Sequence, residues 1–404
     1  MFSFELDTIL LITLPTLAFF LVSFYIFDLY DIRVEFKTFR CLTLIVESLL
    51  FTTLLMIVFL YIYPIEAWSR AFFLDLILTG FFITLWHLYY SVFLKLTIPK
   101  RNIVIIGPAE KANAVHALLG KYPEYQIIAS IDAASSPLKI PCDHRIDDII
   151  VTTYPVKSES LDRELVRCKL EGIDIYDKLT LYEAFMYKVP VGYIQERWIV
   201  DSQGLKALNR TIYTRLKGLG DILTSLAFLA ILFPLGLIIS IAIKLTSKGP
   251  VFFIQERIGL NHKVFRLIKF RTMVKGAEKK DPKWADRDDP RVTAVGKILR
   301  RTRLDELPQL INVLKGEMSI IGPRPEREFF IEKLIKKIPH YSLRFSVKPG
   351  LTGWAQVNSG YAASEKDAVE KLEYDLYYVK NISFFLDFRI FLKTIRTIIF
   401  GMGR

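Results

Sequence analysis

Cysteine and histidine are scarce in this chain of 404 residues, which has three cysteines and five histidines. Cys41, Cys142 and Cys168 show none of the spacings that hold a metal ion, and the histidines are scattered. The sequence therefore does not indicate a zinc site. It also shows no internal repeat and no low-complexity segment.

The glycine fingerprint of a dinucleotide-binding domain is missing as well. Residues 107–112 read Gly-Pro-Ala-Glu-Lys-Ala, which does not match Gly-x-Gly-x-x-Gly. A Tyr-x-x-x-Lys pair of the dehydrogenase kind is absent between Arg101 and Asp201. Both absences argue against a nucleotide-sugar dehydratase or epimerase.

Hydrophobic residues and positive charge, in contrast, are abundant. Hydrophobic residues make up 52% of the chain, and 54 Lys and Arg against 42 Asp and Glu give a net charge of +12. This balance predicts membrane segments and anionic partners such as phospholipid headgroups or nucleotide-sugars. No nucleic-acid partner is expected, because the basic residues flank apolar runs and carboxylates and no recognition fold is evident.

Residues 1–100 contain three apolar runs, Leu6–Tyr30, Cys41–Tyr63 and Ala71–Leu94. Each reaches the ~20 residues that a transmembrane helix needs. The first run lacks a signal-peptide cleavage site, so we expect it to be retained. Basic residues around Lys37 and Lys100 predict cytoplasmic loops, which makes the chain a multi-pass protein of the cytoplasmic membrane.

Residues 101–201 have the pattern of a soluble α/β domain, with a helix at Ser158–Leu170. Alternating strands and helices predict a parallel, Rossmann-like sheet. Without the glycine fingerprint, this domain is expected to be a scaffold or assembly domain that could mediate a homodimer, and residues 202–214 form a linker. The expected strands are Ile103–Ile106, Ile127–Ile131, Asp148–Thr152 and Gly172–Tyr176.

Another apolar segment, Asp221–Ile243, contains Pro234 near its middle and has basic residues on both sides. A simple span would place one basic flank outside the cell, against the positive-inside tendency. Proline can bend a helix sharply. We therefore predict a re-entrant membrane helix at about 219–246, with an ordinary proline-kinked fourth span as the alternative.

Adjacent carboxylates, Asp305 and Glu306, lie between three upstream arginines and Arg324, which stands between two prolines. Pro308 predicts a helix start, and Gly316 predicts its end. Carboxylates, arginines and a helix start at one point suit phosphoryl transfer with a divalent metal. The alternative is an exposed charged turn with surface ion pairs.

Four ordered motifs make the stretch more specific. They are Lys269–Met273, Leu304–Leu310, Gly322–Pro325 and Pro349–Asn358. With these motifs, the sequence from residue 215 to the C-terminus resembles the bacterial sugar transferases, which are monotopic-type polyprenyl-phosphate phosphoglycosyl transferases. The resemblance implies a mostly α-helical α/β catalytic domain over 215–404. Larger members usually have four N-terminal spans and a degenerate Rossmann-like domain, so the first span is expected to be missing here.

The resemblance also implies a two-step mechanism. Asp305 attacks the β-phosphate of a UDP-sugar and releases UMP, which leaves a phosphosugar bound to the aspartate. Polyprenyl phosphate then accepts the phosphosugar, and inner-leaflet phospholipids are the expected partners of the re-entrant helix. Glu306 would bind Mg²⁺, which neutralises charge that develops on the phosphates.

Further cations and polar groups are candidate substrate-binding residues. Arg324 suits bidentate contact with phosphate, and Lys269, Arg271 and Arg303 would add positive field around the diphosphate. Alternatively, Lys269 and Arg271 form surface ion pairs with aspartates. The candidate partners are Asp286, Asp288 and Asp289.

Two later segments also bear on the substrate. Trp354, with Gln356 and Asn358, suits stacking and hydrogen bonding to a sugar or base, or else Trp354 is a core residue of a packed loop. Asp375 is expected to orient an active-site arginine or lysine. The basic, aromatic run Phe384–Phe400 predicts either a helix on the membrane surface or a core helix with one wet face.

The function predicted from these residues is the first membrane step of cell-surface glycan synthesis on a polyprenyl carrier. Glucose, galactose and N-acetylated hexosamines all remain candidate sugars. The alternative is a membrane-anchored assembly or regulatory protein of polysaccharide synthesis that has no turnover. Both carboxylates of the Asp305–Glu306 pair are present, which favours the enzyme.

Overall fold

The computed structural model of the chain describes most of two compact units, Met1–Leu181 and Tyr182–Arg404. The described residues are 6–27, 29, 39–62, 78–79, 81–82, 85–86, 89, 100–120, 122, 124–132, 146–152, 159–194, 211–274, 276, 289–359 and 364–399. Within these described residues the structure is mixed α/β, with one parallel four-stranded sheet and two helices long and apolar enough to cross a membrane.

The first unit begins with two apolar helices, α1 (Leu6–Ile26) and α2 (Phe39–Ile62). They pack against each other through a hydrogen bond of 2.7 Å from Thr52 Oγ1 to Ser23 Oγ, and both side chains are fully buried. The polar groups are thereby satisfied within the pair while apolar side chains face outward, as a lipid environment requires. The predicted third span, Ala71–Leu94, lies mostly outside the described residues.

The four-stranded sheet follows, with the order β2-β1-β3-β4 and all neighbours parallel. This confirms the parallel sheet predicted from the alternation of strands and helices. The predicted strands and the helix at Ser158–Leu170 lie within a few residues of the observed elements. The elements are β1 (Arg101–Ile106), α5 (Ala109–Leu119), β2 (Tyr125–Ile131), β3 (Asp148–Val151), α6 (Glu159–Leu170) and β4 (Asp174–Asp177), followed by α7 (Lys178–Met186).

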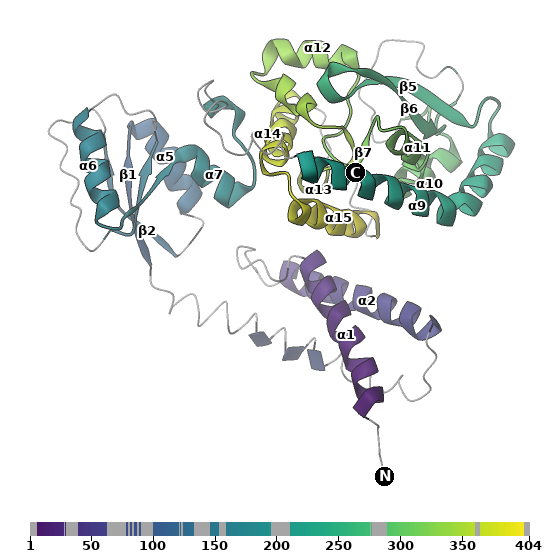
Figure 1. Ribbon diagram of the computed structural model, residues 1–404, viewed down its shortest axis with the longest axis horizontal. Helices are drawn as coiled ribbons and strands as arrows, with labels where there is room; N and C mark the ends of the chain where they lie inside the picture. Colours follow the sequence, from purple (N-terminus) through teal and green to yellow (C-terminus); the bar gives the residue numbers. More distant parts are fainter. Residues whose placement is uncertain are drawn as a thin grey trace. The chain divides into compact units, whose positions relative to one another are not determined.

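The topology places helices on both faces of this sheet. The connection from β1 to β2 runs one way along the sheet and that from β3 to β4 runs the other way. Right-handed crossovers therefore bring α5 and α6 to opposite faces, and they flank β1 in Figure 1. Between the sheet and α6 lies a core that includes Val104 of β1, Ile149 of β3 and Leu165 of α6.

The second unit is built around α9 (Thr211–Thr246), a helix of 36 residues that contains Pro234. Its ribbon changes direction along its length (Figure 1), as expected where proline removes a backbone hydrogen bond. The stretch Ile212–Thr246 is one of the two described segments that could cross a membrane by length and composition. Many of its apolar side chains are exposed, including Ile231 and Phe233.

Both halves of α9 contact the rest of this unit. In the first half, Tyr213 Oη and Lys217 Nζ donate to Asp387 Oδ2 over 2.7 and 2.6 Å. In the second half, Ile239 and Ile243 belong to a core cluster with Phe270 and Leu299. The two ends of the helix are therefore held by one compact unit.

Short strands and helices complete the second unit. β5 and β6 form an antiparallel hairpin, and β7 and β8 form a parallel pair. The elements are β5 (Phe252–Ile258), β6 (Val264–Phe270), α10 (Ala294–Thr302), α11 (Gln309–Leu314), β7 (Ser319–Ile321), α12 (Glu328–Lys337), β8 (Gly350–Thr352), α13 (Trp354–Asn358), α14 (Glu365–Asn381) and α15 (Phe384–Ile399), with 3₁₀ turns at Val191–Tyr193, Leu260–His262, Leu304–Glu306 and Tyr341–Ser346.

Candidate active site

The adjacent carboxylates lie on a 3₁₀ turn between two helices. Arg303 ends α10 in the left-handed conformation, with φ of 56°, and the turn Leu304–Glu306 then leads through Pro308 into α11. The helix predicted to start near Pro308 is confirmed, and Gly316 follows its end with φ of +77°. Asp305 and Glu306 are only 9% and 8% exposed, so this is not a solvated surface turn.

Glu306 is the buried centre of an ion-pair cluster. Its Oε1 accepts from Arg324 Nη2 at 2.7 Å and from Lys269 Nζ at 3.2 Å. Lys269 comes from β6 and Arg324 from the loop after β7, so three separate segments meet at one carboxylate oxygen. The structure thus brings together Asp305, Glu306, Lys269 and Arg324, four of the residues singled out from the sequence.

The two neighbouring carboxylates are in opposite electrostatic environments. Burial raises the pKa of Asp305, and the charge of Glu306 raises it further. Burial also acts to raise the pKa of Glu306, but the charges of Arg324, Lys269 and Arg303 outweigh it and hold the pKa well below its usual range. Glu306 is therefore the fixed anion of the pair, and Asp305 is the more basic carboxylate.

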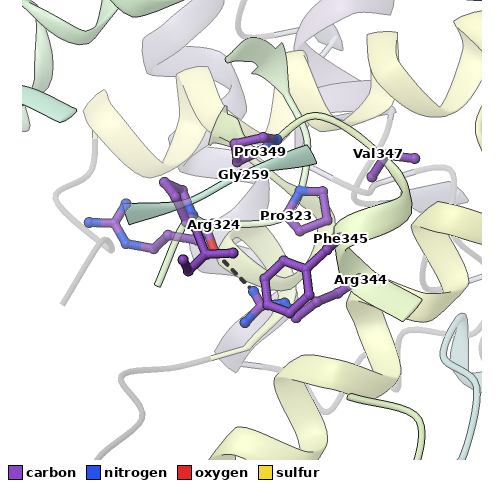
Figure 2. Close-up of a pocket in the computed structure, with 9 residues that line it drawn as sticks. Gly259, Pro323, Arg324, Arg344, Phe345, Val347 and Pro349 are labelled. Carbon is purple, nitrogen blue, oxygen red and sulfur yellow. Dashed lines mark hydrogen bonds between the residues drawn. The ribbon is translucent and has the colours of Figure 1, made fainter. Parts of the chain in front are cut away.

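A second buried pair holds the main chain of Arg324. Arg344 Nη2 donates to the carbonyl oxygen of Arg324 at 2.9 Å and lies 2.8 Å from Asp375 Oδ2. Arg344 also donates to Tyr341 Oη. Figure 2 shows the guanidinium of Arg344 beside the Arg324 carbonyl, while the side chain of Arg324 extends away from it. Asp375 thus orients an arginine that supports the active-site loop.

A small pocket lies beside this loop (Figure 2). Its walls are mostly apolar, and its charged side chains are those of Arg324 and Arg344. The lining residues are Ile258, Gly259, Pro323, Arg324, Pro325, Arg344, Phe345, Val347 and Pro349.

Arg271 lies elsewhere, at the end of α9. Its guanidinium donates to the carbonyl oxygens of Ser247 and Lys248 and to Ser247 Oγ over 2.7–3.2 Å. The side chain is 7% exposed. Cations satisfy the free carbonyl groups at a helix C-terminus and complement its dipole. In the structure, Arg271 thus caps the long apolar helix.

The alternative prediction for Lys269 and Arg271 is a surface ion pair with Asp286, Asp288 or Asp289. Asp289 pairs with Arg291 at 2.5 Å. Asp286 and Asp288 lie outside the described residues. Arg303 adds to the positive field that lowers the pKa of Glu306.

Trp354 is in the core, with 2% exposure. Its Nε1 donates to the carbonyl oxygen of Tyr187 at 2.9 Å, and its ring stacks on Tyr377 with centroids 6.1 Å apart. Gln356 and Asn358 donate to nearby main-chain oxygens at Leu351 and Trp354. Of the two interpretations of this motif, the packed loop is the one that these contacts support.

Two residues of this region were not singled out from the sequence. Arg344 carries no local signal for this role, because Arg324 and Asp375, the two partners that link it to the active-site loop, lie 20 and 31 positions away along the chain. Asn312 is fully buried in α11, accepts from the Ile268 amide and donates to the Arg266 carbonyl oxygen, which fixes α11 against β6.

The donor set is compatible with magnesium. Mg²⁺ is usually held by one or two carboxylates together with substrate phosphates and water, not by a complete protein cage. Asp305 and Glu306 supply the carboxylates. No group of three or more metal-ligating side chains occurs among the described residues, so phosphate oxygens would have to complete the coordination.

Comparison with known proteins places this site in a family. Residues 212–401 match the family model described as bacterial sugar transferase. A putative undecaprenyl-phosphate N-acetylgalactosaminyl 1-phosphate transferase of Bacillus subtilis is 50% identical over 132 residues, which cover 74% of that protein. The chain belongs to the bacterial sugar transferase family.

Two longer relatives are named for different sugars. A UDP-N-acetylgalactosamine-undecaprenyl-phosphate N-acetylgalactosaminephosphotransferase of Aeromonas hydrophila is 43% identical over 242 residues, 60% of this chain and 56% of that protein. A UDP-glucose:undecaprenyl-phosphate glucose-1-phosphate transferase of Escherichia coli is 44% identical over 184 residues, 45% of this chain and 39% of that protein. The matched part of the chain thus spans about half or less of these two proteins.

Proposed function

We propose that this protein transfers a sugar-1-phosphate from a UDP-sugar to undecaprenyl phosphate and releases UMP. The observation that carries the proposal is the buried Asp305–Glu306 pair, in which Glu306 is held by Arg324 and Lys269. Family membership and the printed activities of the relatives support it.

The reaction divides into two displacements at one phosphorus atom. An Asp305 oxygen attacks the β-phosphorus, the bond from that phosphorus to the bridging oxygen breaks, and UMP leaves with this oxygen. A phosphate oxygen of the polyprenyl carrier then attacks the same phosphorus and displaces the Asp305 carboxylate. The elevated pKa of Asp305 suits this role, because a more basic carboxylate is a better nucleophile.

The other residues offset negative charge. Arg324 and Lys269 would contact the diphosphate, and Arg303 would add to the field. Glu306 would hold Mg²⁺, which when bound would neutralise negative charge on the phosphate oxygens. Arg344 and Asp375 keep the Arg324 loop in place.

We further propose that α9 is a re-entrant membrane helix and that the second unit lies on the cytoplasmic face of the bacterial inner membrane. Contacts from both halves of α9 to one unit support this, since a straight span would carry one half across the bilayer. The apolar helices α1 and α2 fit additional spans beside a third, and the parallel sheet fits a degenerate Rossmann-like scaffold.

UMP release tests the proposed function. Detergent-solubilised protein would be incubated with undecaprenyl phosphate, Mg²⁺ and a panel of UDP-sugars that begins with the N-acetylgalactosamine and glucose donors. We expect one donor to give UMP, with the signal lost on chelation and reduced at least ~1,000-fold in Asp305→Asn and Glu306→Gln, because each removes a group on which the chemistry depends.

Folding of the variants is checked by thermal melting in the same detergent. Absence of UMP from folded wild-type protein with every donor would overturn the transferase proposal. It would favour the assembly or regulatory protein without turnover.

A further inference from the structure

Gln309 is a buried amide close to the reacting carboxylates. Its side chain is 3% exposed, and its Nε2 has no hydrogen-bond partner among the residues that the structure describes. Buried polar groups in folded proteins are nearly always paired, and an unpaired donor is costly. An unsatisfied amide at such a position therefore points to a group that binds there.

A second amide in the same helix shows the difference. Asn312, three residues later, is also buried, but its Oδ1 accepts from the Ile268 amide. Its Nδ2 donates at 2.7 Å both to the Arg266 carbonyl oxygen and to Glu317 Oε2. The protein itself satisfies Asn312, and it leaves the amide nitrogen of Gln309 unsatisfied.

The position of Gln309 along the chain brings it near the chemistry. It follows Glu306 by three residues and Asp305 by four, and the backbone bonds Leu307→Leu304 and Leu310→Leu307 continue the helical turn between them. Side chains three and four apart share one face of such a turn. Gln309 therefore lies one turn after the two carboxylates on their side of the helix.

We propose that Gln309 is a further substrate-contacting residue, whose Nε2 donates a hydrogen bond to an oxygen of the phosphoryl group that Asp305 receives. Phosphoryl oxygens accept hydrogen bonds and do not donate them, so they match the unsatisfied amide nitrogen. A neutral donor adds no negative charge beside two carboxylates. This inference rests on the proposed transferase function.

Replacement of Gln309 by methionine separates a substrate contact from a structural role. Methionine keeps an unbranched chain of similar length and removes the unpaired donor. We expect UMP release by Gln309→Met to fall ~100-fold, as for loss of one preorganised donor to a developing oxyanion. Its melting temperature without substrate is expected to stay the same or rise, because an unsatisfied buried group has been removed.

Asn312→Leu is the matched control, because it removes a buried amide whose bonds the protein supplies. Its melting temperature is expected to fall clearly. Gln309→Glu, which keeps the shape but replaces the donor with an acceptor, should be at least as inactive as Gln309→Met.

Three outcomes would overturn the assignment. Wild-type rates in Gln309→Met would exclude a substrate contact, and a loss of activity with a matching fall in melting temperature would make Gln309 structural. In both cases the wild type still releases UMP, so the proposed function stands. Folded wild-type protein that releases no UMP would instead remove the proposed function and this inference with it.

Discussion

At the scale of single residues, the site divides two adjacent carboxylates into different roles. Glu306 Oε1 bonds to Arg324 and Lys269, whereas burial dominates the pKa of Asp305. Two carboxylates in equivalent environments would have similar pKa values and would ionise over the same pH range. The cations beside Glu306 separate the two pKa values, and the result is a fixed anion next to a more basic carboxylate.

This separation predicts how activity depends on pH. In the proposed reaction Asp305 must be ionised to attack the β-phosphorus, so UMP release is expected to fall as the pH drops through the pKa of Asp305. The positive charge of Lys269 lowers that pKa, and Lys269→Met would therefore raise it. We expect the acid limb of the rate profile for UMP release to move to higher pH in Lys269→Met, together with a lower maximal rate.

Lys269→Arg provides the control, because it keeps the charge while changing the shape. Its acid limb should remain close to that of the wild type even if its rate is lower. An unmoved limb in Lys269→Met would mean that the profile reports a group other than Asp305.

Individual residues also differ in how far the sequence predicts them. The carboxylate pair and Arg324 stand in compact motifs with prolines and glycines nearby, so the sequence alone singled them out as candidate site residues. Arg344 and the capping role of Arg271 were not, because their contacts depend on segments that meet only after folding. Trp354 could be assigned to core or substrate only when its burial and its bond to Tyr187 were known.

At the scale of elements, α9 depends on a polar cap at its C-terminal end. Three donors from Arg271 reach Ser247 and Lys248, directly after the helix. The Lys269–Met273 motif therefore makes contacts with two different elements. Lys269 contacts Glu306, and Arg271, two residues later, contacts the C-terminal end of α9.

Arg271→Gln tests this division. Hydrogen bonds that involve a charged group contribute about 1.5–3 kcal/mol each. Glutamine keeps one amide donor group, so we expect a net loss of two of the three bonds, which costs at least about 3 kcal/mol in stability and lowers the melting temperature clearly. The folded fraction should keep the wild-type KM for the UDP-sugar. A raised KM at an unchanged melting temperature would instead make Arg271 a phosphate ligand.

Element positions were largely predictable where the local pattern is strong. Alternating apolar runs predicted the parallel sheet, and Pro308 with Gly316 bracketed α11. The β5–β6 hairpin was not predicted, because its turn at Leu260–His262 uses Asn261 and His262 at positive φ and lacks a glycine pair. Such a turn gives only a weak sequence signal.

At the scale of the whole molecule, the central question is how a helix long enough to cross a membrane can serve a site that we propose to use water-soluble UDP-sugars. The apolar stretch Ile212–Thr246 has 35 residues. As a straight helix at about 1.5 Å per residue it would exceed a hydrocarbon core of ~30 Å. The bend and the contacts of both halves with one unit favour entry and exit on the same side.

Labelling of single cysteines tests this arrangement. Ile212 and Leu245, near the two ends of α9, are 77% and 82% exposed, so a cysteine at either position is open to reagent. We expect Ile212→Cys and Leu245→Cys to react with a membrane-impermeant maleimide in inverted vesicles and not in intact spheroplasts. The wild-type chain gives the background from its native cysteines. Ser69 lies between the second and third predicted spans, on the outer side when the loops at Lys37 and Lys100 are cytoplasmic, so Ser69→Cys should show the reverse pattern. Reaction of Leu245→Cys from the outer side would make α9 a full span, and the site would then need its motifs brought back to the cytoplasm by another route.

Pro234→Ala, which restores the missing backbone donor, is expected to shift part of the Leu245→Cys population toward that outer labelling, because a straighter helix of this length favours crossing the bilayer.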